Sequence, residues 1–156
     1  MTIGDMGTQR EYIESGGFSA YLYLQRGEAI VAPNGVKAKV VEKIDGTRFD
    51  GLPILSNTGE VYLKRNPGGE IVQARIYRNR RPVCDFDLDH AHVNKGSGER
   101  FAKGVVHVQT FVRKPDGTWR RQKHKARNMT DEEVVRYGPL LRKVRPGLKL
   151  RPDDED

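Results

Sequence analysis

The sequence predicts an α+β protein: a curved antiparallel β-sheet of about four to five strands with flanking helices. The chain of 156 residues contains 17 glycines and 8 prolines, which indicates many turns and short strands. In its middle and C-terminal parts, segments that alternate apolar and polar residues are separated by turn sequences. We expect a single domain over residues 1–152, because this length is sufficient to bury one core.

The N-terminal third is ambiguous. Residues 1–16 show no clear pattern. In residues 16–35, "GGFSAYLYLQRGEAIVAPNG", the spacing of Phe18, Tyr21 and Leu22 suits a short helix, whereas Tyr21, Tyr23 and the pair Ile30–Val31 suit a strand. Both interpretations stay open.

Strands are predicted with more definition from Val36 onward. "VKAKVVEKI" alternates and then stops at Asp45-Gly46-Thr47, a hairpin-like turn. The strands "GEVYLKR" and "EIVQARIYR" flank a turn at residues 66–69, and a third strand covers residues 83–88. A fourth, at residues 105–112, turns back at residues 115–117 into "TWRRQK". We expect strands 83–88 and 105–112 to be antiparallel neighbours joined by the long loop 89–104.

A helix is predicted after these strands. Thr130 and Glu133 form a capping box, and the acidic residues 131–133 suit the N-terminus of a helix. Pro139 limits or kinks the helix. Its expected apolar face consists of Val134, Val135, Leu140 and Leu141.

The positive charge of the chain favours a polyanionic partner, and nucleic acid is the first candidate. The formal net charge is +7, and residues 113–151 carry 13 Lys or Arg against four acidic residues. A merely soluble cationic surface is the alternative. The acidic residues 153–156 predict a disordered tail.

The sequence also predicts a soluble, cytoplasmic protein without a membrane partner. Cys84 is the single cysteine, so an internal disulfide is excluded, and a buried strand position suits it best. No apolar run approaches the ~20 residues that cross a bilayer. The polar N-terminus resembles neither a signal nor a transit peptide.

The stretch "CDFDLDHAHVNKG", residues 84–96, carries the chemistry. On a strand, Asp85, Asp87 and Asp89 share one face, opposite an apolar face formed by Cys84, Phe86 and Leu88. Clustered carboxylates repel one another unless cations neutralise them. The preceding hairpin offers Arg75, Arg78, Arg80 and Arg81.

The histidines around this strand suit phosphodiester cleavage. His90 and His92 begin the long loop, and His107 lies on the next strand, where it could meet them. One imidazole would accept a proton and another would donate one, while cations hold the developing phosphorane charge. Alternatively, His90 and His92 are exposed loop residues and His107 fills a half-buried strand position. We assign His124 to a cationic surface.

A metal site is the third interpretation. "DxDxDHxH" offers oxygen and imidazole ligands suited to Mg, Mn, Ca or Zn, and "LDHAH" imitates the Asp-His pair of an HNH-type nuclease. However, the following segment alternates like a strand, where an HNH nuclease needs a helix. The sequence therefore predicts neither a metal nor another cofactor.

Residues 74–111 as a whole, "ARIYRNRRPVCDFDLDHAHVNKGSGERFAKGVVHVQTF", resemble toxin-like and phage-borne domains of the barnase–EndoU–colicin–RelE (BECR) group. Arg75, Tyr77, Asp85, Asp87, Asp89, His90 and His107 fall on that group's pattern. The resemblance implies a curved four-stranded sheet and metal-independent ribonuclease activity, with the RNA 2′-hydroxyl as nucleophile and a 2′,3′-cyclic phosphate as product. It departs at residues 104–107, which read Gly-Val-Val-His instead of Pro-His-x-His.

The function predicted from sequence is thus a metal-independent ribonuclease from a phage, mobile element or toxin system. RNA is the expected partner, with a host or immunity protein as a further one. A non-catalytic interaction protein is the second hypothesis and an HNH-like nuclease the third. The predicted catalytic residues are His90, His92, His107, Asp87 and Asp89. The predicted nucleic-acid-binding residues are Arg75, Arg78, Lys95, Arg100, Lys103, Arg120, Arg121 and Lys123.

Overall fold

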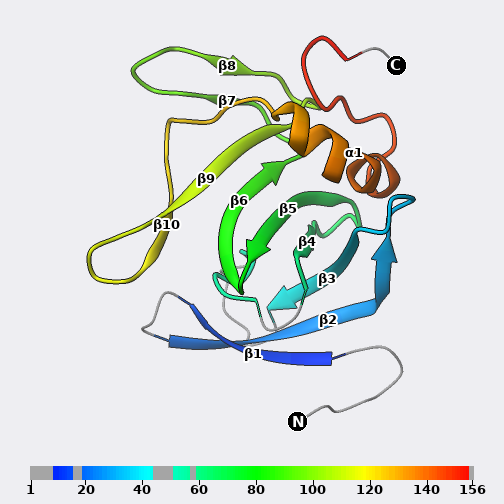
Figure 1. Cartoon of the computed structure of the whole chain (residues 1–156), viewed down its shortest axis with the longest axis vertical. Coiled ribbons are helices and arrows are strands. Elements are labelled where there is room, and N and C mark those ends of the chain that lie inside the picture. The colour runs from blue at the N-terminus through cyan, green and yellow to red at the C-terminus, as the bar shows by residue number, and fades with distance from the viewer. Residues whose placement is uncertain (1–8, 16–18, 44–50, 57–58, 155–156) are drawn as a thin grey trace.

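A computed structural model describes residues 9–15, 19–43, 51–56 and 59–154. Within these ranges the chain forms one large sheet, a two-stranded hairpin and one helix, α1 (Figure 1). The strands are β1 (Gln9–Ser15), β2 (Ser19–Val31), β3 (Lys37–Lys43), β4 (Val61–Arg65), β5 (Ile71–Arg78), β6 (Arg81–Asp87), β7 (His92–Val93), β8 (Arg100–Phe101), β9 (His107–Arg113) and β10 (Trp119–Arg121), and α1 spans Asp131–Val144.

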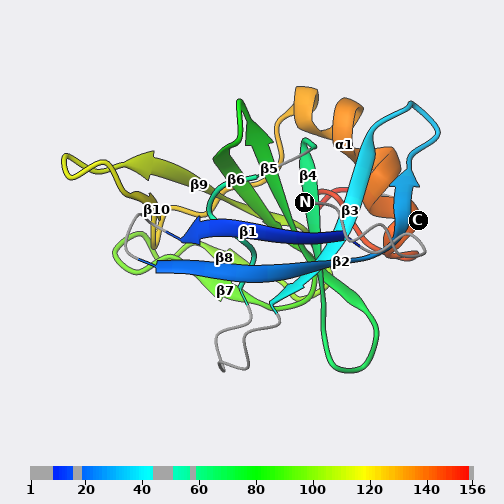
Figure 2. The same cartoon turned by 90° about the horizontal axis from the view of Figure 1, so that it is seen from below.

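The predicted fold class is wrong. The large sheet has eight strands in the order β1-β2-β3-β4-β5-β6-β9-β10 and curls strongly, and the described residues contain one helix instead of several flanking ones. β1, in residues 1–16 where the sequence showed no clear pattern, and β2, in residues 16–35 where a helix and a strand were both open, are two strands beyond those predicted. β1 and β2 run side by side as a long hairpin across the sheet (Figure 2).

The helical alternative for the N-terminal third is also wrong, because Tyr21, Leu22 and Tyr23 lie on β2. Phe18 and the turn at Asp45-Gly46-Thr47 lie outside the described residues. β3 and β4 pair in parallel, so a tight hairpin turn cannot join them.

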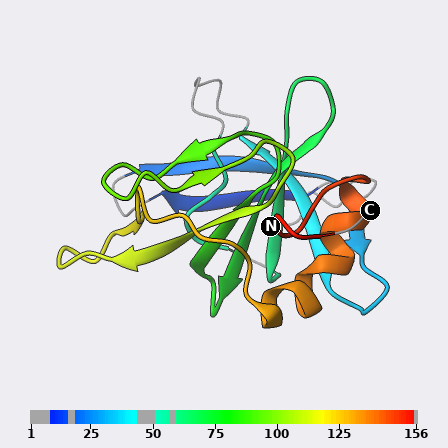
Figure 3. The same ribbon diagram turned by 90° about the horizontal axis from the view of Figure 1, so that it is seen from above.

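The central strand predictions are confirmed. β6 and β9 are antiparallel neighbours, and the turns at residues 66–69 and 115–117 are present. The long connection between these two strands carries a small hairpin of β7 and β8 (light green in Figure 3).

The two faces of the sheet differ in chemistry. One face packs under α1, where Phe86 meets Tyr137 and Leu140 and Leu141 are fully buried. Cys84, a free thiol, is buried there as predicted. The other face of β5, β6 and β9 carries buried polar residues: Gln73, Arg75, Asp85, Asp87, His107 and Gln109. This face holds the candidate site.

The predicted capping box of α1 is confirmed, with Thr130 as the N-cap residue and Glu133 as its partner. Pro139 lies inside the helix, which continues to Val144. The predicted apolar face is wrong at Val135, whose side chain is 75% exposed.

The first two residues of the acidic tail, Asp153 and Asp154, are among the described residues. The Asp154 carboxylate accepts a hydrogen bond from the Leu150 backbone N–H at 2.9 Å and pairs with Arg142 at 3.0 Å. Residues 155–156 lie outside the described range.

Among the described residues, no helix has the length and apolar character that crossing a bilayer requires.

Glu133 provides a pH-dependent stabilisation of this helix. Burial raises the pKa of its carboxyl, but bonds to Arg127 and Thr130 outweigh burial and hold the pKa below its ordinary value of 4.5. Its contribution to stability is complete above the unfolded-state pKa and is lost as pH falls through the lower folded-state value. Urea unfolding measures the difference in the free energy of unfolding between wild type and Glu133→Gln. We expect this difference to be smaller in acid than at neutral pH. A pH-independent difference would contradict this expectation.

Candidate active site

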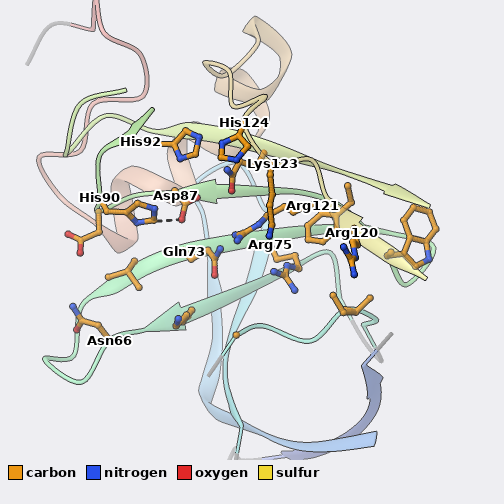
Figure 4. Close-up of a pocket in the computed structure, with 18 of the residues that line it drawn as sticks. Asn66, Gln73, Arg75, Asp87, His90, His92, Arg120, Arg121, Lys123 and His124 are labelled. Carbon is orange, nitrogen blue, oxygen red and sulfur yellow. Dashed lines mark ion pairs between the residues drawn. The ribbon is translucent and has the colours of Figure 1, made fainter. Parts of the chain in front are cut away.

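An open cavity of about 980 Å³ lies on the polar face of the sheet, away from α1 (Figure 4). Its walls come from the 51–54 segment, the β4–β5 turn, strands β5 and β9, the end of β6, and the chain from β10 to His124. The side chains that point into it include Gln73, Asp87, His90, His92, Arg121 and His124.

Asp87 and His107 form the centre of the site. Asp87 ends β6 and His107 begins β9, and the antiparallel register places the two residues directly opposite each other. His107 Nε2 lies 3.1 Å from Asp87 Oδ2, and the Nδ1 of His90 lies 3.9 Å from Asp87 Oδ1. A single carboxylate is therefore shared by two imidazoles.

The two imidazoles differ greatly in exposure. The side chain of His90 is 63% exposed, whereas that of His107 is fully buried. The half-buried position predicted for His107 is thus wrong, because the loop after β6 folds over it. The Phe101 ring of β8 lies 5.8 Å from the His107 ring, and the His90 ring stands edge-on to it at 5.3 Å.

His92 packs on the same buried ring. Its ring stacks on His107 with centroids 5.2 Å apart and planes 19° apart. His92 Nε2 lies 3.1 Å from Asn94 Oδ1, an acceptor, so the neutral His92 ring carries its proton on Nε2. The lone pair on His92 Nδ1 is then available to accept a proton.

Asn94 is a positioning residue that the sequence did not identify. It is buried, and its amide exchanges two hydrogen bonds of 2.9 Å with the Ala126 backbone, accepting from N–H and donating to C=O. These bonds fix the loop that carries His90 and His92 against the segment after β10. A lone asparagine in a glycine-rich loop gives no sequence signal of such a contact.

Asp85 lies at the centre of a second, structural network. Arg75 donates two hydrogen bonds to it, from Nε at 2.6 Å and from Nη2 at 2.9 Å, and Gln73 and Arg121 each contact Oδ2 at 3.2 Å. Arg75 also donates to the Leu52 carbonyl at 2.7 Å. Arg75, which was predicted to bind nucleic acid, lines the cavity, but its side chain is buried and engaged with Asp85 and the 51–56 segment.

The burial of Asp87 governs its protonation. Burial raises the pKa of its carboxyl, but contact with His107 and the charges of His90 and Arg121 together lower the pKa below the ordinary value. Asp87 is therefore an ionised carboxylate at neutral pH, able to orient an imidazole and stabilise its charged form.

The remaining predicted residues divide into two groups. Arg120, Arg121 and Lys123 line the cavity, and so does His124, which had been assigned to a surface patch. Asp89 also lines it but pairs with Arg145 at 2.7 Å. The structure does not bring the others into the cavity: Arg78 lies on the face that α1 covers, and Lys95, Arg100 and Lys103 are exposed on or beside the β7–β8 hairpin.

No family model, curated protein or solved structure matches this chain.

Proposed function

We propose that the cavity binds RNA and that its histidines cleave the phosphodiester backbone without a metal. The observation that supports this most directly is the buried Asp87 carboxylate 3.9 Å from an exposed His90, in a cavity that Arg120, Arg121 and Lys123 also line. Imidazoles beside cations have the chemistry that phosphoryl transfer to an internal hydroxyl requires.

His90 is the general base in this proposal. Its ring is exposed to the cavity, and Asp87 stabilises the imidazolium that forms when His90 takes the proton of the 2′-hydroxyl. The 2′-oxygen attacks phosphorus, the bond to the 5′-oxygen breaks, and a 2′,3′-cyclic phosphate forms. Arg121 and Lys123 stabilise the charge on the phosphorane oxygens.

His92 is the general acid. Its ring stacks on the buried His107 ring, whereas the His90 ring stands edge-on to His107. His92 also lines the same cavity as His90. Protonated on Nδ1, it delivers that proton to the departing 5′-oxygen. His107 is fully buried and does not reach substrate, so it acts as a positioning residue that holds Asp87 and supports both outer rings.

The same proposal extends to the biological system in which the protein acts. Metal-independent cleavage through the 2′-hydroxyl is what the resemblance to the BECR group implies, and that resemblance suggests a phage, mobile element or toxin system. A ribonuclease of this kind would act in the cytoplasm, and a host or immunity protein would have to control it.

Incubation with mixed RNA, with and without EDTA, tests the proposal. We expect cleavage in both conditions, products that end in 2′,3′-cyclic phosphate, and no cleavage of DNA, which lacks the nucleophile. The measurement is gel analysis of end-labelled RNA. Cleavage that EDTA abolishes, or that also cuts DNA, would exclude the mechanism proposed here.

A non-catalytic RNA-binding protein is the second candidate. The burial of His107 favours it, because a residue of the BECR pattern is thereby withdrawn from substrate. This candidate predicts intact RNA that is retained by the protein at low salt and released steeply as salt increases, since phosphate contacts release counterions.

A further inference from the structure

Three side chains at the floor of the cavity present metal-ligand atoms to one another. Asp87, His90 and His107 each offer one such atom, and these atoms all lie within 4.8 Å of one another. Two of the ligands end and follow β6, and the third begins the neighbouring strand β9. The ligands are therefore held largely by the sheet.

His107 gives an independent indication of a missing ligand. Its side chain is fully buried, yet neither ring nitrogen has a hydrogen-bond partner of regular geometry, although Nε2 lies 3.1 Å from the Asp87 carboxylate. A buried imidazole nitrogen without a regular hydrogen bond is costly, because it has lost its bond to water. An ion that accepts the Nε2 lone pair removes this cost at the nitrogen that faces Asp87.

We propose that Asp87, His90 and His107 bind one divalent transition-metal ion of the zinc type, with the remaining coordination position open to the cavity. Two imidazole nitrogens and one carboxylate oxygen suit Zn²⁺ or Co²⁺, whereas Mg²⁺ and Ca²⁺ prefer oxygen ligands. An open position is the arrangement of ions that bind a water molecule or a substrate.

The distances are compatible with such an ion after one small movement. Ligand atoms around a tetrahedral Zn²⁺ are about 3.4 Å apart, and the contact of His107 with Asp87 is already 3.1 Å. The contact of His90 with Asp87 is 3.9 Å, so His90 must move inward. Its side chain is 63% exposed, which leaves it room to rotate.

This ligand set differs from the one that the sequence offered. The sequence grouped Asp87 and His90 with Asp89, but Asp89 is 2.7 Å from Arg145 and lies at the edge of the cavity. His107 takes its place from a distant part of the chain. The inference does not rest on RNA cleavage. A bound ion would occupy the His90 lone pair that accepts the proton in the proposed cleavage, so we expect the ion to inhibit that reaction.

Cobalt binding to the untagged, full-length chain tests the site. After metal removal by EDTA and buffer exchange, Co²⁺ titration should give visible d–d absorption that saturates at one equivalent, and Zn²⁺ should displace the signal. Zn²⁺ should also raise the melting temperature, since an ion that binds only the folded state stabilises it. Mg²⁺ should do neither.

Two exposed cavity histidines provide the variant and its matched control. His90→Ala should abolish the Co²⁺ absorption and the Zn²⁺-dependent rise in melting temperature, and His124→Ala should leave both unchanged. Wild type that shows no saturable absorption, or His90→Ala that retains it, would overturn the metal site. Metal binding without RNA cleavage would refute only the proposed function, and cleavage without metal binding would refute only the present inference.

Discussion

Asp85→Ala is expected to lower the free energy of unfolding by about 3–5 kcal/mol, the range for removing one partner of a buried ion pair. The side chain of Asp85 is fully buried and that of Arg75 is 7% exposed, so the substitution removes the carboxylate to which this buried guanidinium donates two hydrogen bonds. The Leu52 and Pro53 carbonyls still accept from Arg75.

Arg121→Ala is the matched control for this prediction. Arg121 contacts the same Asp85 oxygen, but its side chain is 41% exposed. We expect it to contribute at most about 1 kcal/mol, the typical upper value for an exposed ion pair. Urea unfolding of both variants measures the two effects. A similar small loss for both would show that the Arg75–Asp85 pair contributes little to stability.

The alternation around Asp85 illustrates what could be predicted from the sequence. A period of two residues correctly separated Cys84, Phe86 and Leu88 from the three aspartates, because side chains on a strand alternate between faces. The same pattern could not reveal that the aspartate face is also buried. That burial comes from the 51–56 segment and the loop after β6, which depend on the tertiary fold.

The strand count failed for a related reason. β1 and β2 extend the sheet on the side of β3. Residues 1–16 showed no clear pattern, and the pattern of residues 16–35 suited a helix as well as a strand. Pairing with neighbours, rather than local pattern, determines their conformation. The stretch from Ala74 to Phe111, which carries the resemblance to the BECR group, contains all of β6 and most of its neighbours β5 and β9. These strands belong to a sheet larger than the four strands that the resemblance implied.

The site was predicted in part. The sequence indicated that His90, His92 and His107 would meet, and the ring contacts confirm this. The spacing of the histidines in the sequence could not show how exposed each side chain is. This exposure separates His90, which can touch substrate, from the buried His107, which cannot. Asn94 and the participation of His124 in the cavity depend on contacts between segments about 30 residues apart, which a single sequence does not show.

His90→Ala is expected to reduce RNA cleavage by about 10²–10⁴-fold, the usual contribution of a positioned general base. The fold should remain intact, because the side chain is 63% exposed and its contact with Asp87 is 3.9 Å long. Substitutions at such surface positions usually change stability by about 0.5 kcal/mol or less. Initial rates on a labelled RNA, together with the melting temperature, provide the measurement.

His107→Ala does not provide the same test, although His107 is among the catalytic residues predicted from the sequence. The ring is fully buried against His90, His92 and Phe101, so its removal leaves a cavity, and large-to-small core substitutions of this kind cost about 2–5 kcal/mol. Loss of cleavage in that variant would be ambiguous.

His124→Ala is the appropriate control, because His124 lines the same cavity, is exposed and makes no contact with Asp87 within ion-pair distance. Equal rates for wild type and His90→Ala would remove His90 from the mechanism, and an equal loss in both variants would indicate RNA binding instead of proton transfer.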